Sequence, residues 1–407
     1  MKTKLVIISF LIAVAAPAWG QRLSREQAVQ TALQNNPSIH AAESQVDYFR
    51  QLKKTGTDIG KLSANWMHGQ YNSVYQDNNL TLTQSIPFPT TLAAQVKLGK
   101  EEVIGSQKNL TAVQNTLAFE VKSAFEQLVY QEALRNLLNA QDSLYTDFAR
   151  ASSLRYKTGE SNLLEKTSAE TQLLEIKNQI RINDADIQIL QSRLQAMLKS
   201  ESPIEANEIL RRLTPPDVAT SLKVNPQLDF LNQQIVVSHQ QRAVERSKIM
   251  PDLMIGYFTQ SLTGIQNING TDTFFSRDKR FNGFTVGLGI PLWAGPQLAR
   301  AKAASFQEEI SRKNAEYFEA TLKGAYEQAG REFDKNEASL RYYEGSALQN
   351  ADLILTQAKK AYRGGEIGYI EYLQSLRSAL GIKANYLMAL HQYNLSIIKL
   401  EFILGKI

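Results

Sequence analysis

The sequence predicts a mainly α-helical chain with a small β part, built as two tandem repeats of short helices, two strands and two long helices. All eleven prolines lie outside two stretches, 90–202 and 297–407, that are rich in Ala, Leu, Gln, Glu and Lys. An alternation of apolar with small or polar residues precedes each stretch, and matching short sequences recur in both halves. Because proline inside a helix costs about 3 kcal/mol, the proline-free stretches predict very long helices.

The N-terminus has the pattern of a secretory signal over residues 1–20. Two lysines precede an apolar stretch at 5–16, and Ala18 and Gly20 supply the small residues of a cleavage site. We therefore expect the mature chain to begin at Gln21. A buried N-terminal helix is the alternative interpretation.

Composition argues against several classes of protein. The chain has no cysteine, so we expect no disulfide, no thiolate metal site and no cysteine that carries a lipid. A net charge of +5 is too small to argue for nucleic acid. No segment after the signal holds the roughly 18 consecutive apolar residues of a membrane-spanning helix. A secreted chain of this kind is expected in the periplasm, outside the cell, or in the outer membrane as a β-barrel.

The first repeat covers residues 21–210. It opens with two short helical segments, Ser24–Gln34 and Pro37–Lys54, and continues with strands at about 62–71 and 80–88. Long helices then follow at about 90–156 and 160–200.

A linker at 211–217, marked by Pro215-Pro216, leads into the second repeat at 218–407. Its short helices are expected at 218–224 and 226–247. Its strands and long helices are expected at about 253–262, 282–292, 296–363 and 366–405, with polar loops joining each strand pair at 72–79 and 263–280.

The last strand shows the clearest period of two. Phe284, Val286, Leu288, Ile290 and Leu292 alternate with small or polar residues, which gives one apolar face. Aromatic residues gather in or near the four strands. They suit the aromatic girdles of a membrane interface, and ordinary packing of a sheet core is the alternative. These aromatics are Trp66, Tyr71, Tyr75, Phe88, Phe258, Phe274, Phe275 and Trp293.

Each first long helix would span roughly 100 Å at about 1.5 Å per residue, and would end at a glycine turn. The two turns are Thr158-Gly159 and Gly364-Gly365. The return helices carry seams of residues seven apart: Leu173, Ile180, Ile187 and Leu194 in the first, with Ile176 between them, and Ala379, Tyr386, Tyr393 and Leu400 in the second. This spacing predicts coiled-coil packing.

Four strands are too few to close a barrel, and open edges in a membrane leave backbone groups unpaired. Cyclic association of three copies would supply twelve strands and seal every edge. The long helices would then form a second, hollow cylinder.

The chain resembles the TolC family of outer-membrane efflux proteins over nearly its whole mature length. The resemblance rests on the duplicated plan, on the strand-to-helix sequence 290–295 (Ile-Pro-Leu-Trp-Ala-Gly), and on the helix-turn sequences 156–165 and 362–371. It implies a homotrimer in which a 12-stranded outer-membrane β-barrel continues into a periplasmic coiled-coil α-barrel. It also implies a passive exit duct for efflux or type I secretion. The partners would be a periplasmic adaptor (membrane fusion) protein, an inner-membrane pump and outer-membrane lipid. Among pumps, the RND type is the first expectation.

The resemblance also assigns roles at the periplasmic entrance. Glu371 would form a ring of three acids that attracts cations, with Glu165 at the matching position of the first repeat. The family has a second acid where this chain has Gln374, so a single ring is expected. Tyr362 would hold the entrance shut, helped by pairing of Arg363 and Lys157 with nearby acids. The turn residues Thr158, Gly159, Gly364 and Gly365 would contact the adaptor.

Other interpretations remain open from the sequence. Glu165 and Glu371 could be solvated surface charges. The whole chain could be a periplasmic coiled-coil adaptor or scaffold, and a diffusion porin is disfavoured because only four strands are visible. We expect no enzyme, cofactor or metal centre, since the four histidines are scattered and no phosphate loop or nucleophile elbow occurs. The cargo is left between metal cations, which residues 84–90 faintly favour, and drugs or other small molecules.

Overall fold

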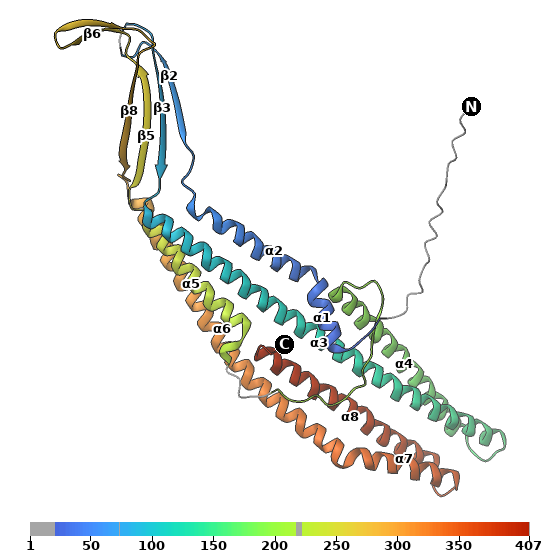
Figure 1. The fold of residues 1–407 in the computed structure, drawn as a ribbon. Coiled ribbons are helices and arrows are strands. Elements are labelled where there is room, and N and C mark those ends of the chain that lie inside the picture. Colours follow the sequence, from blue (N-terminus) through green and yellow to red (C-terminus); the bar gives the residue numbers. More distant parts are fainter. Residues whose placement is uncertain (1–20, 73, 217–221, 407) are drawn as a thin grey trace, which may run out of the picture. The chain divides into compact units, whose positions relative to one another are not determined.

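The computed structural model describes residues 21–72, 74–216 and 222–406 (Figure 1). The predicted signal at 1–20 lies outside the described residues, as does the 217–221 junction between the predicted linker and the second repeat. The described chain forms two compact units, each drawn from both halves of the sequence. The helical unit combines residues 21–37, 114–216 and 325–406, and the sheet unit combines residues 38–113 and 222–324.

None of the helices in the described part of the chain has the length and apolar character needed to cross a membrane.

The sheet unit holds a four-stranded antiparallel sheet in the order β2-β3-β5-β8. The central neighbours β3 and β5 come from different repeats, so their pairing joins the two halves of the sequence. The predicted fourth strand ran to Leu292, but β8 ends at Gly289, shortly before Pro291, which has no N–H to donate. The four strands are Ser63–Gly69 (β2), Asp77–Ile86 (β3), Asp252–Ser261 (β5) and Arg280–Gly289 (β8).

The sheet has two different faces. Pairing across the strands puts Leu82, Tyr257 and Phe284 in one row, and Ile255 beside Val286 in the next. Phe284 is 81% exposed and Val286 is 77% exposed, so this apolar face has no cover within the described chain. The opposite face is mixed. It carries small and polar residues, namely Asn65, Thr81, Thr83, Ser85, Gly256, Thr285 and Gly287, and among them the larger apolar side chains Met67, Met254, Phe258 and Phe281.

The predicted polar loop at 263–280 is wrong in part, because it contains a β-hairpin. Strands β6 (Gly264–Ile268) and β7 (Thr271–Phe275) pair antiparallel. Asn269 and Gly270 have positive φ angles of 52° and 86°, the conformation that a tight two-residue hairpin turn requires. The Asn-Gly pair was the available sequence signal for this turn.

Four helical segments of the sheet unit pack beside one another through polar contacts. Gln233 Nε2 on α5 donates to Glu101 Oε2 on α3 (Pro89–Lys157) over 2.7 Å. The hydroxyls of Ser238 on α5 and Ser311 on α6 (Gly295–Tyr342) lie 2.8 Å apart. The short helical elements here are α2 (Pro37–Leu52), the 3₁₀ turns η1 (Lys53–Thr57) and η2 (Leu222–Val224), and α5 (Pro226–Ser247), which Asn225 caps.

The helical unit begins with a small parallel pair of strands that the sequence did not indicate. Strand β1 (Gln21–Leu23) pairs with β4 (Ile204–Ala206), and α1 (Arg25–Asn35) follows directly. Ser24 caps α1 and exchanges hydrogen bonds with Gln27. Residues 21–23 are thereby held next to the segment that follows the first return helix.

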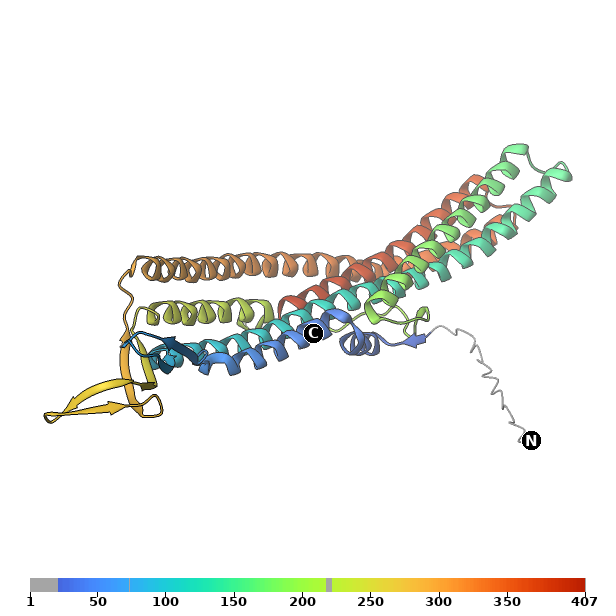
Figure 2. The same ribbon diagram turned by 90° about the horizontal axis from the view of Figure 1, so that it is seen from above.

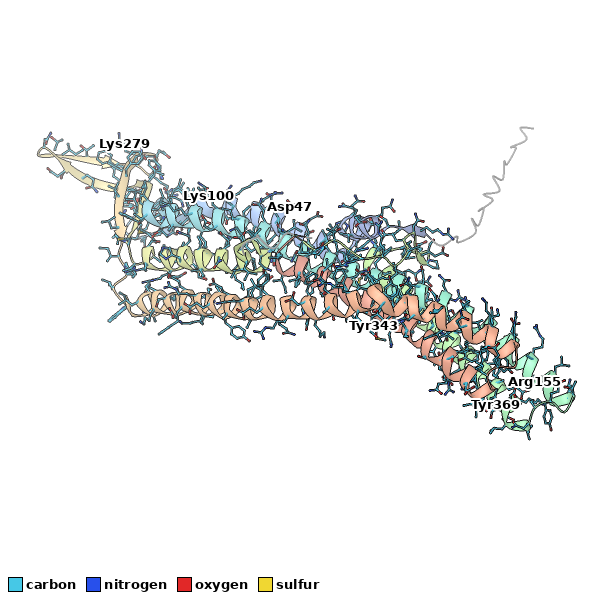
Figure 3. The ribbon with its side chains drawn as sticks, turned by 90° about the horizontal axis from the view of Figure 1, so that it is seen from below. Asp47, Lys100, Arg155, Lys279, Tyr343 and Tyr369 are labelled. Atoms are coloured by element: carbon cyan, nitrogen blue, oxygen red, sulfur yellow. The ribbon has the colours of Figure 1, made fainter. Side chains whose placement is uncertain are left out.

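The first predicted long helix is continuous, whereas the second is interrupted. Helix α3 runs unbroken over Pro89–Lys157. Its counterpart consists of α6 (Gly295–Tyr342), a π-helical turn η3 (Tyr343–Ala347) and α7 (Leu348–Arg363). Arg212 bridges this interruption by binding Glu337 over 3.0 Å and Glu344 over 3.3 Å. Figure 3 labels Tyr343, the first residue of the π-helical turn.

The return helices are α4 (Leu163–Leu198) and α8 (Tyr369–Ile403). Their predicted seams face the interior at several positions, since Ile176 and Leu194 on α4 and Ala379 and Tyr393 on α8 are buried. In both ribbon views α4 lies with the end of α3, and α7 lies with α8 (Figure 2). One apolar cluster joins all four helices near their turns: Tyr145, Phe148, Ala149, Ala169, Ile176, Ala358, Tyr372, Leu376 and Leu380.

Candidate functional site: the two helical turns

The turns that join α3 to α4 and α7 to α8 have the same backbone geometry. Gly159 and Gly365 have φ angles of 79° and 77°, which glycine adopts without strain. The next amide in each turn reaches back five residues, from Glu160 N to Arg155 O and from Glu366 N to Ala361 O. This pattern ends a helix by satisfying its last carbonyls. The glycine turns predicted from sequence therefore recur as one motif.

Each return helix then begins with a glutamate at its third position, but the two carboxylates differ in environment. Glu165 is only 4% exposed, and its amide donates to the capping side chain of Asn162 over 2.9 Å. Glu371 is exposed, and its carboxylate accepts a hydrogen bond from Gly368 N over 3.1 Å. Both acids also lie at the positive end of a helix, which favours negative charge.

Glu165 is the centre of a polar cluster that links the two hairpins. Tyr362 Oη donates to Glu165 Oε1 over 2.8 Å, and Arg155 Nη1 donates to the same oxygen over 3.2 Å. Arg155 Nη1 also lies 3.2 Å from Tyr362 Oη. The last turns of α3 and α7 are thus tied to the first turn of α4. Figure 3 shows Arg155 and Tyr369 near the ends of these hairpins.

Aromatic rings pack against one another beside this polar cluster. The rings of Tyr362 and Tyr372 stack with centroids 4.5 Å apart, and Phe148 contacts both. Burial, together with the carboxylate of Glu165, raises the pKa of Tyr362, so its hydroxyl stays protonated and able to donate. The hydrogen bond to Tyr362 raises the pKa of Arg155, and the adjacent Glu165 adds to this effect.

The remaining predicted entrance residues lie on the surface of the hairpins. Gln374, Arg363 and Lys157 are exposed, and neither of the two cations forms an ion pair within the described residues. Arg155 instead supplies the cation that pairs with Glu165, and sequence reasoning did not identify it. Its only signal was its position four residues before Gly159. Thr158 caps the end of α3, since its hydroxyl donates to Arg155 O over 3.1 Å.

Two grooves run along the hairpins close to these turns. One, between α4 and α8, has a volume of about 570 Å³ and includes Gln374 and Arg377 in its lining. The other, between α3, α7 and α8, has a volume of about 390 Å³. No group of three or more metal-ligating side chains is found in the part of the chain that the structure describes.

Known proteins resemble this chain in both sequence and fold. Residues 218–406 match the family model described as "Outer membrane efflux protein". The match covers the second of the two predicted repeats, and its description agrees with the TolC-family resemblance of the sequence.

Individual proteins that resemble this chain are distant from it in sequence. The "Probable outer membrane lipoprotein SilC" of Salmonella typhimurium is 21% identical over 344 residues, covering 81% of this chain and 72% of the relative. A structure of CusC has a TM-score of 0.78 at 17% identity, covering 94% of this chain and 92% of that one. The outer membrane protein VceC of Vibrio cholerae has a TM-score of 0.75 at 16% identity, covering 94% and 96%. These structures share the fold of this chain.

Proposed function

We propose that three copies of this chain assemble into a closed conduit that forms the exit duct of a tripartite efflux or type I secretion system. The observation that carries the proposal is the sheet of the sheet unit. It presents an apolar face in which Phe284 and Val286 are exposed, and a more polar face on the other side, where small and polar residues lie beside Met254 and Phe258. A wall with lipid on one side and water on the other needs this pattern.

The strand order explains why several copies are needed. Strands β2 and β8 are the two edges of the sheet, and neighbouring strands are antiparallel throughout. With four strands per copy, β2 of one copy can pair antiparallel with β8 of the next without changing the alternation. Three copies then give a closed barrel of about twelve strands, in which no backbone group is left unpaired in lipid.

We assign the two helical turns to the periplasmic entrance of this conduit. The cluster of Glu165, Tyr362 and Arg155 holds the two hairpins of one chain together, so loosening it would widen the entrance. The exposed Glu371 is free to face its copies around the threefold axis. The turn residues Thr158, Gly159, Gly364 and Gly365 would meet the adaptor protein, which connects the duct to an inner-membrane pump, first of all one of RND type.

The choice of cargo belongs to the pump in this proposal, because a passive duct needs no cargo pocket. Metal cations and organic small molecules are both compatible with it. Export assays in cells that lack the chain, with an RND-type pump expressed alone or together with it, would separate these two classes of cargo.

Fractionation and electrophoresis test the proposal directly. We expect a heat-modifiable trimer in the outer-membrane fraction, which resists a salt wash and conducts ions after reconstitution into a planar bilayer. A monomer, or a protein released from membranes by salt, would favour the periplasmic adaptor or scaffold instead. A trimer that inserts but does not conduct would contradict the exit duct while leaving the assembly intact.

A further inference from the structure

The apolar face of the four-stranded sheet becomes polar at the end that lies away from the helices. Strands β3 and β8 lead into α3 and α6 at their other ends, where the last row of this face is apolar and consists of Ile86, Leu253 and Leu288. The final row at the opposite end, which we call the distal row, consists of His68, Asn78, Ser261 and Arg280. Figure 1 shows the β6 hairpin beyond this end of the sheet. One end of the face therefore suits hydrocarbon and the other a polar boundary.

Arg280 is held in the distal row by neutral groups alone. Its Nε donates to Thr259 Oγ1 over 3.2 Å, and its Nη2 donates to Thr259 O over 2.9 Å. Its Nη1 donates to Asn78 Oδ1. Arg280 forms no ion pair within the described residues. The guanidinium has more N–H donors than these three bonds use, so it is fixed in position and can still bind a ligand.

Two further cations lie just before Arg280, in the turn between β7 and β8. Arg277 Nε donates to Gln76 O over 3.3 Å, and Lys279 is exposed (Figure 3). Neither side chain forms an ion pair with any residue that the structure describes. The distal end of the sheet therefore presents a cluster of cations.

The acids of this region are engaged elsewhere or lie apart. Asp77 is fully buried, and its Oδ1 accepts hydrogen bonds from the Ser261 hydroxyl and from Thr263 N, each over 2.8 Å. Asp272 lies near the tip of the β6–β7 hairpin and accepts a hydrogen bond from Asn267 Nδ2 over 2.7 Å. Only the exposed Asp278 lies among the three cations.

A neighbouring copy would not supply the missing charge either. The proposed function places β2 of one copy beside β8 of the next, and β2 (Ser63–Gly69) contains no acid. The counter-charge for Lys279 and Arg280 is therefore expected from a ligand that reaches this face from the surrounding membrane.

From this we infer that Arg280 and Lys279 bind the phosphate of a glycolipid in the outer leaflet of the outer membrane. The inference rests on the proposed function, which places the apolar face in lipid and the helices in the periplasm, and it names the lipid. Guanidinium and ammonium groups bind phosphate through charge-assisted hydrogen bonds, and arginine can reach two phosphate oxygens at once. Phe284 follows Arg280 by four residues, about 13 Å along the strand, so acyl chains below a phosphate at Arg280 would cover it.

Two glycolipids that differ only in phosphate serve as probes: diphosphorylated lipid A and its fully dephosphorylated form. Binding of each to the detergent-purified full chain is measured by native mass spectrometry. EDTA is present because Mg²⁺ would compete for the phosphates. We expect the phosphorylated lipid to bind about tenfold more tightly, and this preference to shrink as salt rises.

Removal of the two cations provides the decisive variant. Lys279→Gln combined with Arg280→Gln should reduce the preference to about twofold or less, because the charge-assisted bonds are lost. The matched control, Lys61→Gln combined with Arg300→Gln, removes an exposed lysine and an exposed arginine near the other end of the sheet and should leave the preference unchanged. Lys279→Gln alone should give an intermediate loss, and it tests the site even if the sheet needs Arg280 to fold.

Three outcomes would overturn the inference while the parent protein is still a trimer that conducts ions, so that the exit duct stands. Equal binding of the two lipids would mean that phosphate is not recognised. Equal loss of preference in both double variants would mean that only the overall charge matters. Loss of the trimer in the distal variant, with the lipid preference retained, would assign the cations to contact between copies. A protein that never enters the outer membrane would overturn both the lipid site and the exit duct.

Discussion

The two helical hairpins follow one plan, yet their return helices are buried to different extents. In the first hairpin, α4 buries six residues, while in the second, α8 buries fourteen. Helix α4 also exposes a stripe of large apolar side chains at helical spacing: Leu163, Leu164, Leu174, Ile182 and Ile189. A duplicated chain can thus devote one copy of the hairpin to its own core and leave the other for contacts between subunits.

The two turns repeat this contrast on a smaller scale. The carboxylate of Glu165 is buried and binds side chains of both hairpins, whereas that of Glu371 is exposed and binds only backbone. Tyr362 is half-buried in the cluster, whereas its counterpart Tyr156 is 40% exposed and lies near the ammonium of Lys166. The two turns therefore share a backbone motif but place the same residue types in different environments.

The largest expected effect concerns the loss of stability at acidic pH, and it arises in the second return helix. His391 on α8 is 3% exposed and stacks on Tyr130, and burial lowers its pKa from the ordinary 6.5 to about 4. Because the unfolded chain binds a proton below pH 6.5 and the folded chain does not, stability falls as pH falls from 6.5 towards 4. The loss from this group alone is about 3 kcal/mol.

Urea unfolding at pH 7 and pH 4.5 measures this effect. His391→Phe should keep the stacking and reduce the difference between the two pH values. His239→Phe is the control, because the imidazole of His239 is 59% exposed. A pH difference that is the same in His391→Phe and the parent protein would contradict the assignment.

The next effect compares the two glutamates directly. Glu165→Ala leaves the Tyr362 hydroxyl and Arg155 without their shared acceptor, which should cost about 2 kcal/mol, moderated because Arg155 can reach water. Glu371→Ala removes a helix cap and should cost about 1 kcal/mol. Hydrogen exchange of residues 156–170 should therefore accelerate roughly thirtyfold in the first variant, and that of residues 364–376 about fivefold in the second. Equal acceleration in the two variants would mean that the buried Glu165 cluster stabilises its turn no more than the exposed Glu371 cap stabilises the other.

The exposed stripe of α4 offers a test of subunit contact. We expect Leu174→Glu combined with Ile189→Glu to destabilise the trimer by about 1.5 kcal/mol per subunit, because two apolar side chains lose their partner surface. Helix content should stay unchanged by circular dichroism. Lys177→Glu on the same helix is the control. If the trimer resists heat equally in both variants, the stripe does not lie in the interface between subunits.

Much of the fold is predictable because its signals are local. Proline-free stretches and glycine turns fix where α3, α4 and α8 begin and end, and the alternation from Phe284 to Leu288 fixes a strand and its apolar face. The π-helical turn at Tyr343–Ala347 was not predictable, since no proline marks it and its support comes from Arg212, far away in sequence. The β6–β7 hairpin was missed because its strands are short and their apolar residues do not alternate regularly with polar ones, although Asn269-Gly270 marked the turn.

The candidate site was predictable only in part, for the same reason. The spacing from glycine to glutamate located Glu165 and Glu371 correctly at the start of each return helix. It could not tell which carboxylate is buried, because burial depends on Tyr362 and Phe148, which tertiary packing brings together. The predicted roles of Lys157 and Arg363 concern an assembled entrance and stay predictions.

The smallest expected effect is on ion conduction, and it concerns the exposed glutamate, Glu371. If Glu371 forms a ring around the threefold axis, Glu371→Gln should lower the preference for cations over anions about twofold to threefold and weaken block by multivalent cations, since the local negative potential is lost. Single-channel recording at low salt measures both quantities, and screening should reduce the effect at high salt. The reciprocal change Gln374→Glu adds an acid one turn later and should increase cation preference. Unchanged selectivity and block in both variants would mean that Glu371 is only a helix cap, and that the contrast between the two turns is one of packing alone.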